Sequence, residues 1–92
     1  MRTIHKFQIP ASEFPTITMP VGAEVLSAKS QRGNDITLWA LVETNAEMAK
    51  RTFVVVGTGH PMPCIERDRL RFIDTVLLAE GALVFHVFEF FR

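Results

Sequence analysis

The stretch with the most chemical potential is Gly57-Thr58-Gly59-His60, which follows three consecutive valines. Its two glycines permit positive φ angles, so neighbouring backbone N–H groups could converge on an anion, and the threonine could add a hydroxyl. A phosphate-binding loop normally opens a helix, however, whereas two prolines follow closely here. Because glycine and proline commonly mark turns, we interpret the stretch first as a structural turn and second as the rim of a ligand pocket.

Three arginines alternate a few residues later, at Arg67, Arg69 and Arg71. In an extended segment a spacing of two puts all three side chains on one side. Guanidinium groups pair bidentately with phosphate oxygens, so this row favours a polyanion or a phosphorylated ligand. The nearby acidic residues would instead give a solvated, salt-bridged edge. Trp39, in LWALV, is either a core residue or a platform on which a base stacks.

The remaining reactive side chains form no recognisable catalytic or metal-binding pattern. His60 and Cys64 lie four residues apart, but neither a Cys-x-x-Cys nor a His-Glu-x-x-His pattern accompanies them. His86, between two apolar residues, is typical of a hydrogen-bonded structural histidine. We therefore expect no enzyme, no metal and no cofactor.

The sequence predicts β-strands over most of the chain, and these strands must position the residues discussed above. Apolar alternation, β-branched runs and turn residues predict strands within residues 3–10, 16–20, 21–31, 35–43 and 51–57, and a hairpin over 71–92 that turns at Glu80-Gly81. The stretch TNAEMAK at 44–50 is the only helix-like piece. The sequence predicts an all-β fold in one domain over residues 1–92. We expect a small antiparallel sandwich or barrel of six to seven strands, with a C-terminal hairpin and at most one short helical turn.

Composition narrows the class of partner. Ten basic and ten acidic residues cancel, which argues against nucleic-acid binding, since that usually needs a basic excess. A single cysteine excludes an internal disulfide. No apolar run approaches the roughly 20 residues of a membrane span, and we see no signal peptide. We expect a protein of a reducing cytoplasm that does not bind membranes.

The last strand is apolar on both faces, which a half-buried strand of an antiparallel sheet is not. One face carries Leu83, Phe85 and Val87 and the other Val84, Phe88 and Phe90. Exposing such phenylalanines forgoes several kcal/mol each, at ~25 cal/mol per Å². We therefore expect a homo-oligomer with an interface at the second face. The alternative is that loops of the same chain cover Phe88 and Phe90.

Four stretches that together span nearly the whole chain carry a resemblance: IHKFQIP, ITMPVGAEVLSAKSQRGNDITLWALVE, FVVVGTGHPMP and FIDTVLLAEGALVFHVFE. Their LWALV, GTGHP and GALVFHVFE motifs resemble a family of short, uncharacterised bacteriophage and prophage proteins. Glu43 stands where the family pattern has an aspartate. Because the family is a domain of unknown function, the resemblance implies no catalytic residue.

The resemblance implies a non-enzymatic phage accessory protein in the host bacterial cytoplasm, acting in phage–host conflict. The first hypothesis is an oligomer that sequesters a small phosphorylated or nucleotide signalling ligand. The GTGHP turn and the arginine row would contact phosphate, and Trp39 would stack on a base. The alternatives are an inhibitor that docks onto a host defence protein through its apolar strand, a virion or assembly accessory protein, and a small hydrolase built around His60.

Overall fold

The computed structural model describes residues 1–10 and 12–91, and it consists of strands joined by turns. The strands are β1 (Arg2–Ile9), β2 (Thr16–Pro20), β3 (Glu24–Lys29), β4 (Ile36–Glu43), β5 (Met48–Gly57), β6 (Leu70–Leu78) and β7 (Leu83–Phe90). Two short 3-10 turns, η1 (Arg67–Arg69) and η2 (Ala79–Gly81), flank β6. Within the described residues, no helix has the length and apolar character needed to cross a membrane.

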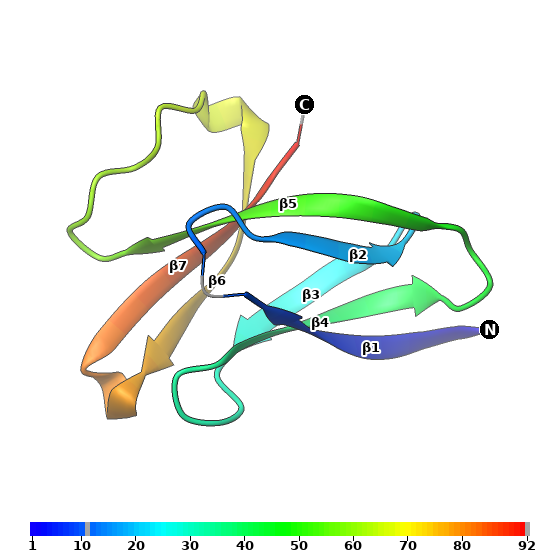
Figure 1. Cartoon of the computed structure of the whole chain (residues 1–92), viewed down its shortest axis with the longest axis horizontal. Coiled ribbons are helices and arrows are strands. Elements are labelled where there is room, and N and C mark those ends of the chain that lie inside the picture. Colours follow the sequence, from blue (N-terminus) through cyan, green and yellow to red (C-terminus); the bar gives the residue numbers. More distant parts are fainter. Residues whose placement is uncertain (11, 92) are drawn as a thin grey trace.

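The strands form two antiparallel sheets. One has the order β1-β4-β3 and the other the order β2-β5-β7-β6, and β6 and β7 make the C-terminal hairpin (Figure 1). The predicted all-β fold and its hairpin are confirmed. The sheets remain two separate layers and do not close into a barrel, so of the two predicted architectures the sandwich is the one formed.

The core lies between the two sheets and follows the two-residue alternation of their strands. In β4, the buried residues Ile36, Leu38, Ala40 and Val42 all point inward. In β1, Ile9 lies opposite Ile36 and within the same core. The second sheet contributes Ile17, Met19, Phe53, Val76, Leu78 and Val87.

A single aspartate joins the two sheets where their edge strands β3 and β6 meet. A bulge in β6 between Phe72 and Asp74 shifts the register with β7. The Asp74 carboxylate accepts hydrogen bonds from the Ala28 N–H at 3.2 Å, the Lys29 Nζ at 3.1 Å and the Thr75 N–H at 2.9 Å. Burial acts to raise the pKa of this carboxyl, but these donors outweigh it and hold the pKa below its usual value.

A buried ion pair ties β5 to β7. The Arg51 guanidinium donates to both carboxylate oxygens of Glu89, at 2.9 Å from Nη2 to Oε1, and to the Ala23 carbonyl at 2.7 Å. The hydrogen bond to Glu89 raises the pKa of Arg51, and the arginine stays charged. No buried side-chain nitrogen or oxygen of the described residues lacks a hydrogen-bond partner. This region of the interior is therefore fully satisfied.

The helical turn predicted at residues 44–50 is wrong. The chain makes a tight turn there, closed by a hydrogen bond from the Ala46 N–H to the Glu43 carbonyl, and β5 begins at Met48. Residues 48–50 pair with β2, and this tertiary pairing overrides a weak local helical preference. The two 3-10 turns lie elsewhere, at η1 and η2.

Candidate functional site

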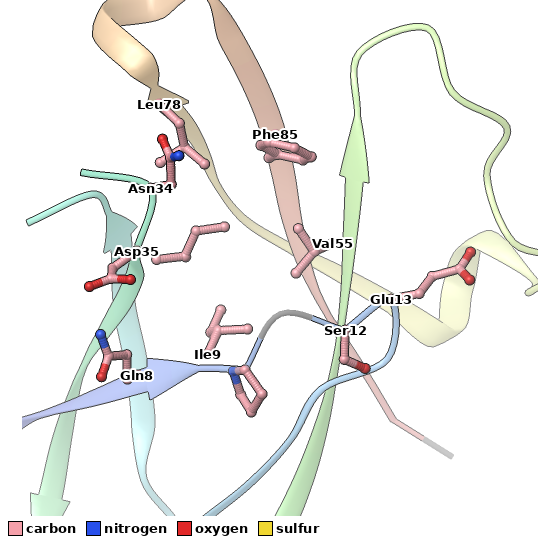
Figure 2. Close-up of a pocket in the computed structure, with 11 residues that line it drawn as sticks. Gln8, Ile9, Ser12, Glu13, Asn34, Asp35, Val55, Leu78 and Phe85 are labelled. Carbon is pink, nitrogen blue, oxygen red and sulfur yellow. The ribbon is translucent and has the colours of Figure 1, made fainter. Parts of the chain in front are cut away.

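A cleft of about 780 Å³ lies at one end of the space between the sheets. It is bordered by the last residues of β1 and β6, the first residues of β4 and β7, and the C-terminal part of β5. Figure 2 shows the side chains of Ile9, Val55, Leu78 and Phe85 arranged around one space. Its volume lies within the range of small-molecule sites, about 300–1,000 Å³.

The walls of the cleft are apolar because they continue the core. Ile9, Ile36 and Leu78 are buried core residues, and Val55 and Phe85 are partly buried residues packed against the same core. They are inward-facing positions at the strand ends, where the two sheets no longer cover each other. The cleft is thus an uncovered end of the hydrophobic core rather than a separate structure.

The rim of the cleft is polar and includes two acidic residues. Gln8, Ser12, Glu13, Asn34 and Asp35 line it, and no lysine or arginine of the described chain does. Figure 2 shows the Glu13 carboxylate directed away from the apolar walls, with Asp35 and Gln8 together on the opposite side. The cleft itself therefore suits an apolar body and offers no positive charge to a phosphate.

The GTGHP turn is held by its own hydrogen bonds. The Thr58 N–H donates to the Val84 carbonyl and the His60 N–H to the Gly57 carbonyl, both at 3.0 Å. Gly59 has φ +85°, a conformation that favours glycine. Because two of the N–H groups that a phosphate would need are already paired, the structural interpretation of this turn is favoured.

The turn nevertheless lies beside the cleft. A Cβ on Gly57 would lie 3.0 Å from His60 Nδ1 and 3.5 Å from Phe85 Cε1, and Phe85 lines the cleft. The turn therefore packs the His60 ring close to a wall of the cleft, although His60 does not itself line it. A side chain at position 57 would push that ring aside by a few tenths of an ångström.

His86 has the structural role predicted for it. Its Nε2 lies 2.7 Å from the Thr58 hydroxyl and its Nδ1 lies 3.1 Å from the Thr75 hydroxyl. These contacts fasten the turn to β6 and β7. In the described chain, no group of three or more histidine, cysteine, aspartate or glutamate side chains is placed to hold a metal ion, and Cys64 is exposed.

The three arginines do not form the expected extended row, because Arg67 and Arg69 belong to the 3-10 turn η1. Arg67 donates to the Leu70 carbonyl at 2.7 Å and stacks over the Phe88 ring at 5.9 Å. Arg71 lies over Phe91 at 5.5 Å. The sequence pattern missed these contacts because the segment turns before it joins the sheet.

The predicted ligand-binding residues lie on two different sheets. The Thr58 N–H bonds to Val84 and the Phe91 N–H bonds to Arg69, at opposite ends of β7. Arg67 lies nearer to the turn, because its guanidinium is over Phe88, two residues from His86, whose ring contacts the Thr58 hydroxyl. Trp39 lies in the other sheet, on its outer face opposite Lys6, and is partly buried. One chain therefore does not assemble the turn, the arginines and the tryptophan into one site.

The predicted interface residues are partly covered by their own chain. Phe88 and Phe90 pack on a small second cluster formed by Val54, Val56 and Leu70, and Ile65 joins it from the connection between β5 and β6. Figure 1 shows this long connection reaching out from the sheets before it returns at η1. Val84 is also partly buried. The most exposed apolar side chains of the hairpin are Leu77 at 59% and Phe72 at 50%.

Sequence reasoning missed the cleft because its walls look like ordinary core positions. Ile9, Val55 and Phe85 alternate in the same way as neighbours that are fully buried. Only the sheet ends decide which inward positions stay uncovered. The proline and glycine positions that end β1 and β5 were the available signal, since they mark where the strands stop at this end.

Comparisons with known proteins define the family and not the activity. No curated protein and no solved structure matches the chain significantly. The matched family has no assigned function and transfers no site residue to this chain. Over residues 1–91 the chain matches the family described as "Domain of unknown function (DUF7352)", and it therefore belongs to that family.

Proposed function

We propose that this protein is a non-enzymatic binding protein that holds a small ligand in the cleft between its two sheets. The observation that carries the proposal is the uncovered end of the core, about 780 Å³ in volume and walled by Ile9, Ile36, Val55, Leu78 and Phe85. Apolar walls left open to water are stabilised by an apolar ligand at ~25 cal/mol for each Å² covered.

The proposed setting comes from the resemblance to short phage and prophage proteins. Sequestration of a small host signalling molecule in the host cytoplasm would give such a protein a role in phage–host conflict without a catalytic site. The apolar walls support a ligand with a ring or an aliphatic body, and a nucleotide base satisfies that requirement. Among the described residues the lining holds no lysine or arginine, which supports a ligand that keeps any phosphate outside the cleft.

A titration with 1-naphthol, an uncharged aromatic probe, tests the cleft. We expect ¹⁵N chemical-shift changes to centre on Ile9, Val55 and Phe85. Val55→Trp fills the cleft and is expected to weaken binding about tenfold or more, because a well-packed indole removes the apolar area that the probe covers. Val84→Trp is the matched control, since Val84 is similarly buried but does not line the cleft. Equal binding by Val55→Trp and the unaltered protein would refute the proposal.

A second candidate function, docking through the apolar hairpin, is favoured by the exposure of Phe72 and Leu77. Their neighbours Val84 and Phe88 lie on the same face of β6 and β7, so a partner or a second copy would cover an apolar strip that the hydrogen-bonded Thr75–His86 pair interrupts. Native mass spectrometry of the unaltered protein and of Leu77→Asp tests self-association. We expect an oligomer that Leu77→Asp dissociates, whereas a monomer in both cases would exclude self-association through this strip.

A further inference from the structure

A second hollow adjoins the cleft on the outer side of the β1-β4-β3 sheet. It has a volume of about 460 Å³ and is lined by Lys6, Gln8, Gln31, Arg32, Asp35 and Thr37. Gln8 and Asp35 line both hollows, so the polar groove begins where the apolar cleft ends. A ligand that enters the cleft from this side passes directly over these two residues.

The groove offers more positive than negative charge. Its ionisable lining side chains are Lys6, Arg32 and Asp35, which sum to one net positive charge at neutral pH. Lys6 donates from Nζ to the neutral Gln31 amide oxygen at 3.1 Å. Lys29, on the neighbouring strand β3, is occupied by Asp74.

Neither cation of the groove is neutralised. In the described part of the chain, neither Lys6 nor Arg32 takes part in an ion pair. Lysine has three N–H donors and arginine five, so Lys6 keeps two donors and Arg32 keeps its fork available for an anionic group. The Glu13 carboxylate, the other acid near the cleft, is directed away from the apolar walls (Figure 2).

We infer that the ligand of the cleft is an amphipathic anion, with its apolar body against Ile9 and Phe85 and its anionic head beside Lys6 and Arg32. This inference rests on the proposed function and assigns the head group to residues that the sequence patterns did not single out. The GTGHP turn uses its N–H groups internally, and Arg67 is committed to Leu70 and Phe88, so neither competes for this role.

Matched naphthalene probes separate the head group from the body. We compare 1-naphthyl phosphate, 1-naphthol and 1-naphthylmethylamine by isothermal titration on the unaltered protein. The phosphate is expected to bind about tenfold more tightly than the alcohol, and the amine less tightly than the alcohol, because the groove adds charge-assisted hydrogen bonds only for the anion. The Trp39 indole N–H signal should shift with the phosphate alone, because Trp39 lies opposite Lys6.

Charge variants test the assignment to individual residues. Arg32→Gln and Lys6→Gln are each expected to weaken naphthyl phosphate binding about fivefold and to leave naphthol binding unchanged. Asp35→Asn is expected to strengthen phosphate binding about twofold by removing a repulsive charge. Arg69→Gln is the matched control, since it removes an exposed arginine at η1, away from the groove.

The outcomes separate this inference from the proposed function. Equal binding of naphthyl phosphate and naphthol would refute the anionic head group and leave the cleft as a binding site. The same conclusion would follow if the amine bound more tightly than the alcohol and Asp35→Asn lost this binding of the amine. No binding of any probe overturns both. Once a preference for anions is established, two further probes identify the head group. Binding of adenosine monophosphate would indicate a phosphate head, and binding of 1-naphthoate would indicate a carboxylate head. Either result supports the inference.

Discussion

The inward faces of β5 and β7 end differently in the two directions along the strands. At one end, Arg51 and Glu89 form a buried ion pair that the Ala23 carbonyl completes. Four residues further along each strand, at the other end, Val55 and Phe85 wall an open cleft. The first end, which we call the ion-pair end, has every polar group satisfied, whereas the second, the cleft end, leaves apolar surface uncovered.

This contrast separates stability from binding. In a buried ion pair each charge satisfies the other. Removing one partner leaves an unpaired buried charge and strongly lowers the free energy of unfolding. Uncovered apolar side chains contribute less to folding, and the surface they leave exposed remains available to a ligand. We therefore expect substitutions at the ion-pair end to unfold the protein and substitutions at the cleft end to act mainly on binding.

The largest effect is expected for Glu89→Ala. This substitution leaves the mostly buried Arg51 guanidinium without its counter-charge, and we expect a loss of about 3–5 kcal/mol in the free energy of unfolding. Urea denaturation measures it. The double variant Arg51→Met with Glu89→Leu should recover most of the loss, because it removes both charges. A loss below about 1 kcal/mol in Glu89→Ala would show that the pair is not the anchor of this end.

The next largest losses in the free energy of unfolding are expected when one phenylalanine in the closed core and one at the cleft are each replaced by alanine. Phe53 is fully buried, and Phe53→Ala is expected to lower the free energy of unfolding by about 3–5 kcal/mol. Phe85→Ala is expected to cost about half as much, because its ring is already partly exposed. It should also weaken naphthol binding, which Phe53→Ala should not. Equal unfolding losses in the two variants would mean that the cleft is closed in solution.

The smallest effect concerns Asp74, which joins the sheets between the two ends. Because its folded pKa lies below the unfolded value, its contribution to stability is present above about pH 4 and is lost as pH falls through the folded pKa. Asp74→Asn is expected to cost about 1 kcal/mol at pH 7 and progressively less as the pH falls through the folded pKa. Chemical denaturation across this pH range measures the difference. A constant difference between pH 7 and pH 2 would contradict the role of the carboxylate.

Much of the fold was predictable because alternation is local. The strands at residues 16–20 and 35–43 and the C-terminal hairpin follow from apolar periodicity and turn residues, and the structure confirms them. Residues 44–50 were expected to form a loop with one helical turn, because seven residues are too few for a helix. They form a tight turn instead, and the pairing of residues 48–50 with β2 makes those residues strand.

The candidate site was less predictable for a different reason. The sequence singled out the GTGHP turn, the arginines and Trp39, but Trp39 lies on the outer face of the other sheet and does not join them. Lys6 and Arg32, which border the groove, are 26 positions apart and look like solvated surface charges in the sequence. Their proximity depends on the pairing of β1 with β4 and on the β3–β4 connection.

By itself, the sequence determined an all-β chain, its strand periods and its C-terminal hairpin, because these depend on neighbours within a few residues. It also indicated a hydrogen-bonded His86, but the tertiary structure supplied the partners Thr58 and Thr75. The tertiary structure alone decided which inward side chains stay uncovered, which charges meet across the sheets at Asp74 and between neighbouring strands at Glu89, and where the arginines point. The physical reason is that burial and ion pairing depend on where strands distant in the sequence end against one another, and alternation carries no information about that.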